Sequence, residues 1–129
     1  MQDNNRRLGF IGLGVMGKPM CKNLIKAGYN PVVYDINPEA VQELVQAGAL
    51  AGASPSEIGS RCNIIFTMLP DSPQVESVIC GENGVLEEAL PGSIIIDMSS
   101  IAPLVVKRVA LAAGQKGLGM LDAPVSGGE

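Results

Sequence analysis

The sequence contains no histidine and no tryptophan, and it has only two tyrosines and two phenylalanines among its 129 residues. The absence of histidine excludes histidine-based acid–base catalysis and the commonest zinc sites within this chain. The scarcity of aromatic side chains leaves no stacking surface for single-stranded nucleic acid. An excess of 13 acidic over 9 basic residues is also unsuited to a phosphate backbone. Nucleic acid is therefore not an expected partner, and any proton transfer must use other residue types.

Cysteine is scarce as well. Cys21, Cys62 and Cys80 are widely spaced, and none of them forms a CxxC pair. This pattern indicates neither a disulfide framework nor a metal site, and it fits a reducing, cytoplasmic compartment. Cys21 is expected to fill the core, with a reactive thiol as the alternative. No apolar run approaches the roughly 20 residues of a membrane span, so no membrane association is expected.

Apolar residues make up 47% of the chain, and they occur in short runs separated by segments with helical periodicity. Runs that are apolar on both faces are typical of parallel strands covered by helices on each side. The predicted class is α/β, a Rossmann-type doubly wound parallel sheet, in one domain over residues 1–129. Strands are predicted at 8–11, 31–34, 64–66, 94–96 and 118–121, and helices at 16–27, 38–47, 73–79 and 102–113.

Local signals mark several helix ends. Asn37 is a predicted N-cap, and Pro38 suits the first helical position because its missing N–H costs nothing there. Ser54 and Glu57 have the spacing of a capping box, in which each side chain bonds the other residue's backbone N–H. Gly28 is predicted just past the end of the first helix.

A glycine-rich segment, Gly12-x-Gly14-x-x-Gly17, lies between the first predicted strand and helix. The first glycine allows a tight turn, the second lets a pyrophosphate approach the backbone, and the third lets helix pack on strand. The helix N-terminus would present N–H groups and a partial positive charge to the phosphates. The segment predicts a dinucleotide site, with a purely structural turn as the alternative. Lys18 follows, where a cation could reach a phosphate, although a solvent-facing helix position is the simpler interpretation.

Asp35 ends the next predicted strand, 18 positions after Gly17. Dinucleotide sites of this type place a ribose-binding acid about 20 positions after the glycines. We therefore expect Asp35 to accept hydrogen bonds from the adenosine ribose hydroxyls and to repel a 2′-phosphate. No arginine or lysine follows it in residues 36–38, so NAD is favoured and NADP stays possible. A solvated turn acid is the alternative.

At FIGLGVMGKPM, residues 10–20, the sequence resembles the β-hydroxyacid dehydrogenases, the 3-hydroxyisobutyrate dehydrogenase-like family. The similarity continues in TMLPDSPQVESV (67–78), in GENGVLEEALPGSIIIDMSSIAP (81–103) and in LDAPVSGGE (121–129). It thus covers essentially the whole chain after the first few residues, and the four matches occur in the family's order.

The resemblance implies which residues contact the cofactor. Leu69 and Pro70 match a loop near the adenosine and pyrophosphate, and Ser100 matches a hydroxyl position near the nicotinamide. Gln74 stands where some relatives have an asparagine that contacts the cofactor, which leaves that contact open. The expected cofactor-binding residues are Gly12, Leu13, Gly14, Val15, Met16, Gly17, Asp35, Leu69, Pro70 and Ser100.

The last residues match the family's substrate-anchoring segment. There, consecutive N–H groups and a hydroxyl of Ser126, Gly127 and Gly128 would bind a substrate carboxylate. An ordinary turn is the alternative for this segment. Ser99 and Ser100 also have a simpler interpretation as caps of the helix that starts near residue 102, and capping is compatible with a cofactor contact.

The resemblance also implies an activity. In the family, a hydride passes between the nicotinamide and a carbon of a small hydroxy or oxo acid, while a lysine handles the proton. Reduction of tartronate semialdehyde (2-hydroxy-3-oxopropanoate) to glycerate is the first expectation. Oxidation of 3-hydroxyisobutyrate and reduction of glyoxylate or succinic semialdehyde are alternatives.

The family's lysine lies on a segment beyond this chain, so no catalytic residue is expected within it. We therefore expect the cofactor half of a two-domain, homo-oligomeric enzyme, with its sheet truncated before the last strands and its C-terminal helical domain absent. Such a piece would be inactive alone. A stand-alone, non-catalytic NAD(P)-binding module is the alternative from another class.

Overall fold

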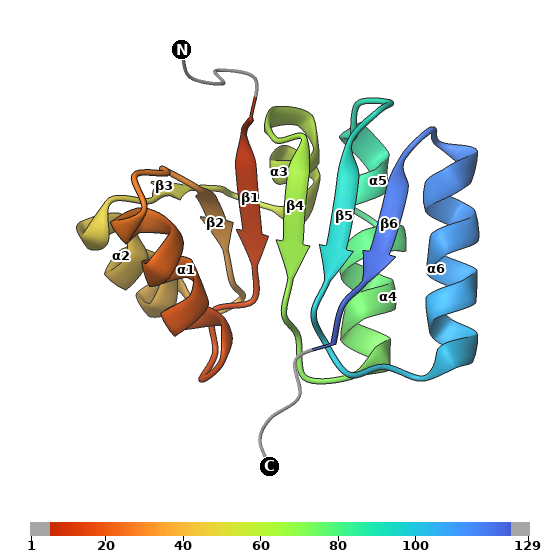
Figure 1. The fold of residues 1–129 in the computed structure, drawn as a ribbon, viewed down its shortest axis with the longest axis horizontal. Coiled ribbons are helices and arrows are strands. Elements are labelled where there is room, and N and C mark those ends of the chain that lie inside the picture. Colours follow the sequence, from red (N-terminus) through yellow and green to blue (C-terminus); the bar gives the residue numbers. More distant parts are fainter. Residues whose placement is uncertain (1–5, 125–129) are drawn as a thin grey trace.

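Six parallel strands form one sheet in the computed structural model, which describes residues 6–124 (Figure 1). Their order, β3-β2-β1-β4-β5-β6, is that of the classic doubly wound fold, so the predicted fold class is confirmed. The expected truncation of the sheet before its last strands concerns sequence outside residues 6–124, so it stays a prediction. The strands are β1 (Leu8–Ile11), β2 (Val32–Tyr34), β3 (Leu50–Ala51), β4 (Ile64–Thr67), β5 (Ile94–Asp97) and β6 (Gly119–Asp122). The helices are α1 (Gly17–Lys26), α2 (Pro38–Ala47), α3 (Pro55–Arg61), α4 (Ser72–Cys80), α5 (Val85–Glu88) and α6 (Pro103–Gln115).

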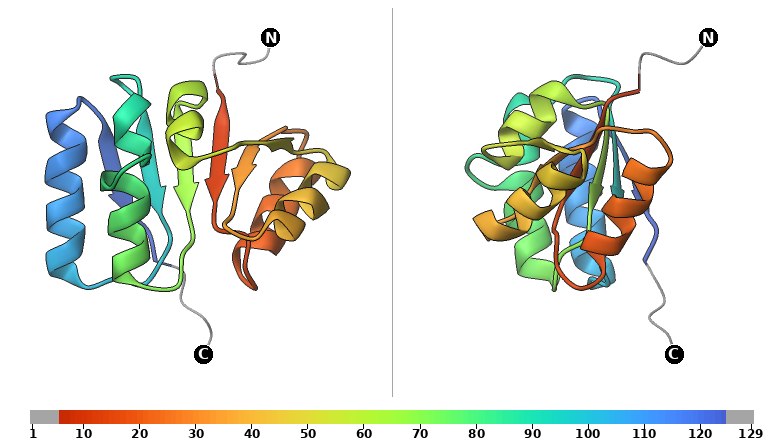
Figure 2. Two further views of the ribbon diagram at one scale, coloured as in Figure 1. Left: turned by 180° about the vertical axis from the view of Figure 1, so that it is seen from behind. Right: turned by 90° about the vertical axis from the view of Figure 1, so that its left-hand side faces the viewer.

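The helices form two separate cores on the two faces of the sheet. Ile65 and Ile95 belong to the core that includes residues of α3 to α6. Phe10 and Val33 belong to the other, with residues of α1 and α2. Figure 1 shows α4 behind β5 and α6 beside β6, and the view from behind in Figure 2 shows both helices in front of the strands, while no helix among the described residues covers the opposite face of β5 and β6. Successive residues of a strand point to opposite faces, which explains why the central strands are apolar throughout.

The strand order creates the place where a ligand can bind. From β1 the chain moves outward through β2 to β3, and it then crosses back to β4 on the other side of β1. The connections after β1 and after β4 therefore leave the sheet in opposite directions. In open parallel sheets, this switch point at the carboxyl ends of the strands is where ligands bind.

Several predicted helix ends are confirmed. The Asn37 side chain accepts a hydrogen bond from the Glu39 N–H at 3.0 Å, and α2 starts at Pro38. Gly28, just past α1, has a φ of 101°, which suits a glycine after a helix end. Ser54 caps α3 by accepting from the Glu57 N–H at 3.1 Å.

Three local features differ from what the sequence suggests. The Glu57 carboxylate accepts from the Ala53 N–H at 2.6 Å instead of from the Ser54 N–H, so Ser54 and Glu57 do not form the reciprocal pair of bonds expected of a capping box. Neither Ser99 nor Ser100 caps α6, because Ala102 is the N-cap and its N–H donates to the Ser72 hydroxyl at 3.0 Å. The two-residue β3 and four-residue α5 were not predicted, since such short elements have too few positions to show a period.

The thiols of the core are inert fillers. Cys21 and Cys62 are buried, and burial raises the pKa of Cys21 to about 12 and that of Cys62 to about 11. Both therefore stay protonated at neutral pH, which favours the packing interpretation of Cys21. Within residues 6–124, no cluster of three or more ligating side chains could hold a metal ion. No helix in the same range is long and apolar enough to cross a bilayer.

Candidate functional site

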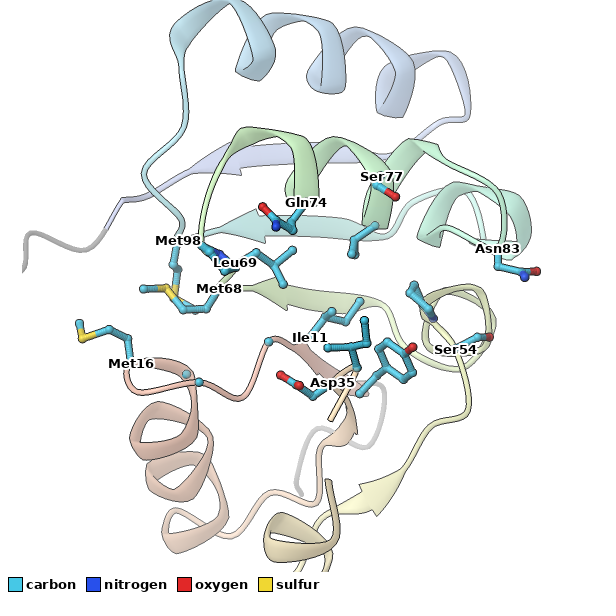
Figure 3. A pocket seen from close by; sticks show the side chains of 18 of the residues that line it. Ile11, Met16, Asp35, Ser54, Met68, Leu69, Gln74, Ser77, Asn83 and Met98 are labelled. Carbon is cyan, nitrogen blue, oxygen red and sulfur yellow. The ribbon is translucent and has the colours of Figure 1, made fainter. Parts of the chain in front are cut away.

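A cleft of about 890 Å³ lies at the carboxyl ends of β1 and β4, at the switch point of the sheet. Its size is in the range of small-molecule and cofactor sites. Figure 3 shows Met16 and Asp35 on one wall and Gln74 and Ser77 on the opposite wall, with Leu69 between them. Four segments distant in sequence therefore meet here: the loop after β1, the end of β2, the connection after β4 and the connection after β5.

The three glycines between β1 and the first turn of α1 have three different surroundings. Gly12 has a φ of 104°, and a Cβ there would collide with the Met68 carbonyl oxygen. A Cβ at Gly17 would collide with the Gly12 carbonyl oxygen, so this glycine sets the approach of α1 to the strand. At Gly14 a Cβ would meet nothing within 4 Å, which leaves that backbone open towards the cleft. This division matches the roles expected of a dinucleotide-binding turn.

The N-terminus of α1 faces the cleft without a side-chain cap. Met16 is its N-cap and makes no capping hydrogen bond, and Gly14, Val15 and Met16 line the cleft. The first N–H groups of a helix lack intrahelical partners and carry the positive end of the helix dipole. This end of the helix is therefore suited to an anion such as a phosphate.

The backbone fixes the Asp35 carboxylate from two sides. Oδ2 accepts from the Leu13 N–H at 2.6 Å, and Oδ1 accepts from the Asn37 N–H at 2.8 Å. The Gly12 N–H adds a bond to the Tyr34 carbonyl at 3.0 Å, which ties the glycine loop to the end of β2. A carboxylate has about four acceptor positions, so Asp35 keeps capacity for the hydroxyls of a ribose.

A buried polar network supports the other wall of the cleft. The Ser99 hydroxyl accepts from the Leu69 N–H at 2.8 Å, so it ties the loop after β4 to the loop after β5. The Thr67 hydroxyl donates to Asp97 Oδ1 at 2.7 Å, and the Ser99 N–H donates to the same oxygen at 3.3 Å. Both loops are thereby held by residues about 30 positions apart in sequence.

Asp97 is the unusual member of this network. It is fully buried, and its Oδ2 is the one buried side-chain polar atom without a hydrogen-bond partner within residues 6–124. Burial raises the pKa of this carboxyl, and the hydrogen bond from the Thr67 hydroxyl offsets that effect only in part.

The structure brings together most of the predicted cofactor residues. The cleft is lined by Gly12, Gly14, Val15, Met16, Gly17, Asp35, Leu69, Pro70 and Ser100, and Gln74 lies in it too. Leu13 is the exception, since its side chain is 2% exposed in the core and only its N–H serves the site, through Asp35. Ser126, Gly127 and Gly128 lie outside the described residues.

Several residues that line the cleft were not predicted from the sequence. Met68 and Met98 add apolar surface towards the end of the cleft where Met16 lies, and Ser54, Ser77 and Asn83 form the polar opposite end (Figure 3). Ile36 lines it as well, and its side chain is 89% exposed. Most of the missed residues follow a strand or a helix end, so position after a strand was the signal available for them, whereas Ser77 lies within α4.

The chain matches known proteins over almost its whole length. Residues 7–129 match the family model described as the NAD binding domain of 6-phosphogluconate dehydrogenase. A 2-hydroxy-3-oxopropionate reductase from Escherichia coli (strain K12) is 49% identical over 123 residues, which is 95% of this chain and 42% of that protein.

Solved structures agree in fold. A 3-hydroxyisobutyrate dehydrogenase from Mycobacterium tuberculosis, solved with L-serine, superposes with a TM-score of 0.87 at 34% identity, covering 95% of this chain and 41% of that one. Psf3 in complex with NADP+ and 2-OPP has the same TM-score, 0.87, at 29% identity over 94% of this chain and 43% of its own. The chain thus spans about two fifths of the length of these relatives.

Proposed function

The chain belongs to the family of the NAD-binding domain of 6-phosphogluconate dehydrogenase, and from this premise we propose that it is the cofactor-binding part of an oxidoreductase acting on a small hydroxy or oxo acid. The observation that carries the proposal is the position of Asp35. Its carboxylate borders the same cleft as the glycine loop and is fixed by the Leu13 and Asn37 N–H groups. A preformed acceptor beside an anion-binding helix end is what an adenosine diphosphate moiety requires.

We assign each wall of the cleft a part of the dinucleotide. The N-terminus of α1 and the open backbone at Gly14 would hold the pyrophosphate, and Asp35 would hold the adenosine ribose. Leu69 and Pro70 would pack near the adenosine and pyrophosphate, and Ser100 would lie near the nicotinamide. The cofactor supplies the hydride chemistry when bound, and the protein supplies orientation and charge.

The proposed substrate is tartronate semialdehyde. Its aldehyde carbon would accept a hydride and its oxygen a proton, which gives glycerate. The support is the 49% identity to a 2-hydroxy-3-oxopropionate reductase. The second candidate, 3-hydroxyisobutyrate, is supported by the structural match at 34% identity.

The proton in this reaction is proposed to come from a lysine outside this chain. The chain has no histidine. Among the described residues that line the cleft, the ionisable side chains are those of Tyr34, Asp35 and Glu82. None of these matches the family's lysine, and Asp35 already has a binding role. The 129-residue chain alone is therefore expected to bind cofactor without turning over substrate.

Titration with NADH and NADPH, followed by calorimetry, tests the cofactor assignment. We expect the wild type to prefer NADH, because Asp35 accepts from ribose hydroxyls and repels a 2′-phosphate. Asp35→Ala should weaken NADH binding roughly tenfold and abolish the preference. Asp71→Ala is the matched control, because Asp71 is exposed and makes no capping hydrogen bond. Undiminished preference for NADH in Asp35→Ala would refute the role of Asp35.

Steady-state kinetics with the full-length protein test the substrate. The ratio kcat/KM should be highest for tartronate semialdehyde among tartronate semialdehyde, 3-hydroxyisobutyrate, glyoxylate and succinic semialdehyde. A clear preference for 3-hydroxyisobutyrate would reject the first substrate and leave the cofactor assignment intact. Turnover by the 129-residue chain alone would contradict the proposed external lysine.

A further inference from the structure

A second, smaller pocket of about 380 Å³ lies next to the main cleft, between the N-termini of α1 and α2. Gly14, Val15 and Asp35 border both pockets. A ribose held by Asp35 would therefore stand at the boundary between them. Any group attached to that ribose on the far side from the pyrophosphate would be placed at the smaller pocket.

One cation lines the smaller pocket among the described residues, and it is Lys18. Its ammonium group forms an ion pair with Glu43 Oε1 at 2.9 Å. The other oxygen of Glu43 pairs with Lys22, also at 2.9 Å. A single carboxylate from α2 thus pairs with the ammonium groups of both Lys18 and Lys22 of α1.

This arrangement persists over the usable pH range. The hydrogen bonds from Lys22 and Lys18 lower the pKa of Glu43 to about 2, so the carboxylate is charged at any pH used for binding measurements. The side chains of Lys18 and Glu43 are 34% and 44% exposed, so salt screens the pair in part. The Glu43 carboxylate therefore stays charged under these conditions, and the free energy of the ion pair is small.

Building on the proposed function, we infer that Glu43 is a second determinant of cofactor choice, which sequesters Lys18 and leaves the pocket beside Asp35 without a free cation for a 2′-phosphate. Dinucleotide sites that take a 2′-phosphate generally place a cation next to the ribose. Here the cation is present but neutralised. Two acidic residues then disfavour NADPH, Asp35 by direct repulsion and Glu43 through Lys18.

The test is Glu43→Gln, with Glu76→Gln as the matched control. Glu76 pairs with Arg108 at 2.8 Å between α4 and α6, so this variant removes the same charge away from both pockets. In calorimetric titrations at low salt, Glu43→Gln should tighten NADPH binding about threefold to fivefold, the range of an exposed ion pair, while NADH binding changes by less than about twofold. The gain should shrink at high salt.

The double variant Lys18→Gln/Glu43→Gln identifies the cation. It should return NADPH affinity to the wild-type value, because the freed ammonium is then absent. Circular dichroism checks that each variant is folded. An unchanged NADPH affinity in Glu43→Gln, an equal change in Glu76→Gln, or a gain that survives loss of Lys18 would each overturn the inference. Absence of NADH binding by the wild type would instead refute the proposed function, and the inference with it.

Discussion

Asp35 and Asp97 both stand at the carboxyl end of a parallel strand beside the cleft, yet their surroundings are opposite. Asp35 is half-buried, and each of its oxygens accepts from a backbone N–H. Asp97 is fully buried and takes its bonds at one oxygen, while the other has no partner in the part of the chain that the structure describes. We call the segments after β1 and β2 the β1–β2 half of the cleft, and those after β4 and β5 the β4–β5 half. The β1–β2 half keeps a hydrogen-bond acceptor available for a ligand, whereas the acid of the β4–β5 half helps to hold two loops together.

The difference shows where each half obtains its rigidity. The backbone donors to Asp35 in the β1–β2 half come from the glycine turn, at Leu13, and from the N-cap of α2, at Asn37, so both lie close to the first β-α-β unit. The β4–β5 half depends on hydroxyl bonds across about 30 residues, such as Leu69 to Ser99. Burying the Asp97 carboxyl group costs free energy because one of its oxygens has no hydrogen-bond partner among the described residues. The rigidity of this half is therefore obtained at a cost in stability.

The largest effect is expected where the two halves touch. Gly12→Ala would place a Cβ against the Met68 carbonyl oxygen, at a φ of 104°. We expect a loss of roughly 3 kcal/mol in the free energy of unfolding, measured by urea denaturation. Gly14→Ala is the matched control, because its Cβ would meet nothing within 4 Å.

Gly14→Ala should keep the stability within about 0.5 kcal/mol of the wild type while weakening NADH binding, because its methyl group faces the cleft. Equal losses of stability in Gly12→Ala and Gly14→Ala would show that the close approach of Gly12 to the Met68 carbonyl oxygen does not exclude a side chain at residue 12.

A smaller effect is expected from Ser99→Ala, which acts on the β4–β5 half alone. The Leu69 N–H would lose its acceptor, at a cost of about 1–2 kcal/mol in the free energy of unfolding. NADH affinity should fall with it, because the loop that contains Leu69 lines the cleft. Ser100→Ala is the control for stability, since Ser100 is exposed. If urea denaturation showed that Ser100→Ala lowers the free energy of unfolding more than Ser99→Ala does, the structural role of the Ser99 hydroxyl would be refuted.

The smallest effect is expected from Asp97→Asn, and it depends on pH. Because burial raises the pKa of Asp97 in the folded state, its contribution to stability is fully present below the ordinary pKa of 3.8. That contribution is lost as the pH rises through the raised value. Asp97→Asn lacks this titration, so its stability relative to the wild type should increase with pH, by up to about 1 kcal/mol at neutral pH.

Thermal unfolding of Asp97→Asn and wild type between acidic and neutral pH measures this difference. Glu43→Gln gives the opposite sign, because the lowered pKa of Glu43 contributes stability above pH 4.5 that is lost as the pH falls towards about 2. A difference curve for Asp97→Asn that is flat, or that has the slope of Glu43→Gln, would contradict the assignment.

The two halves were also unequally predictable. The glycine spacing and Asp35 identified the β1–β2 half, and the cap at Asn37 was predicted to the residue. In the β4–β5 half, Leu69, Pro70 and Ser100 were predicted from the family resemblance, and a helix cap was one interpretation of Ser99. Its hydroxyl instead accepts from Leu69, a partner 30 residues away.

By itself, the sequence determined the features that depend on neighbouring residues: the parallel α/β class, the helix ends, the glycine turn and the acid after β2. Backbone preferences and bonds between residues a few positions apart fix these features, so they are visible in a short segment. Only the tertiary structure decided that Gly12 lies against Met68, that Asp97 is buried with one unpartnered oxygen, and that Glu43 holds Lys18. Each of these contacts joins segments whose distance is set by the packing of the whole sheet and its helices, and no local pattern records that distance.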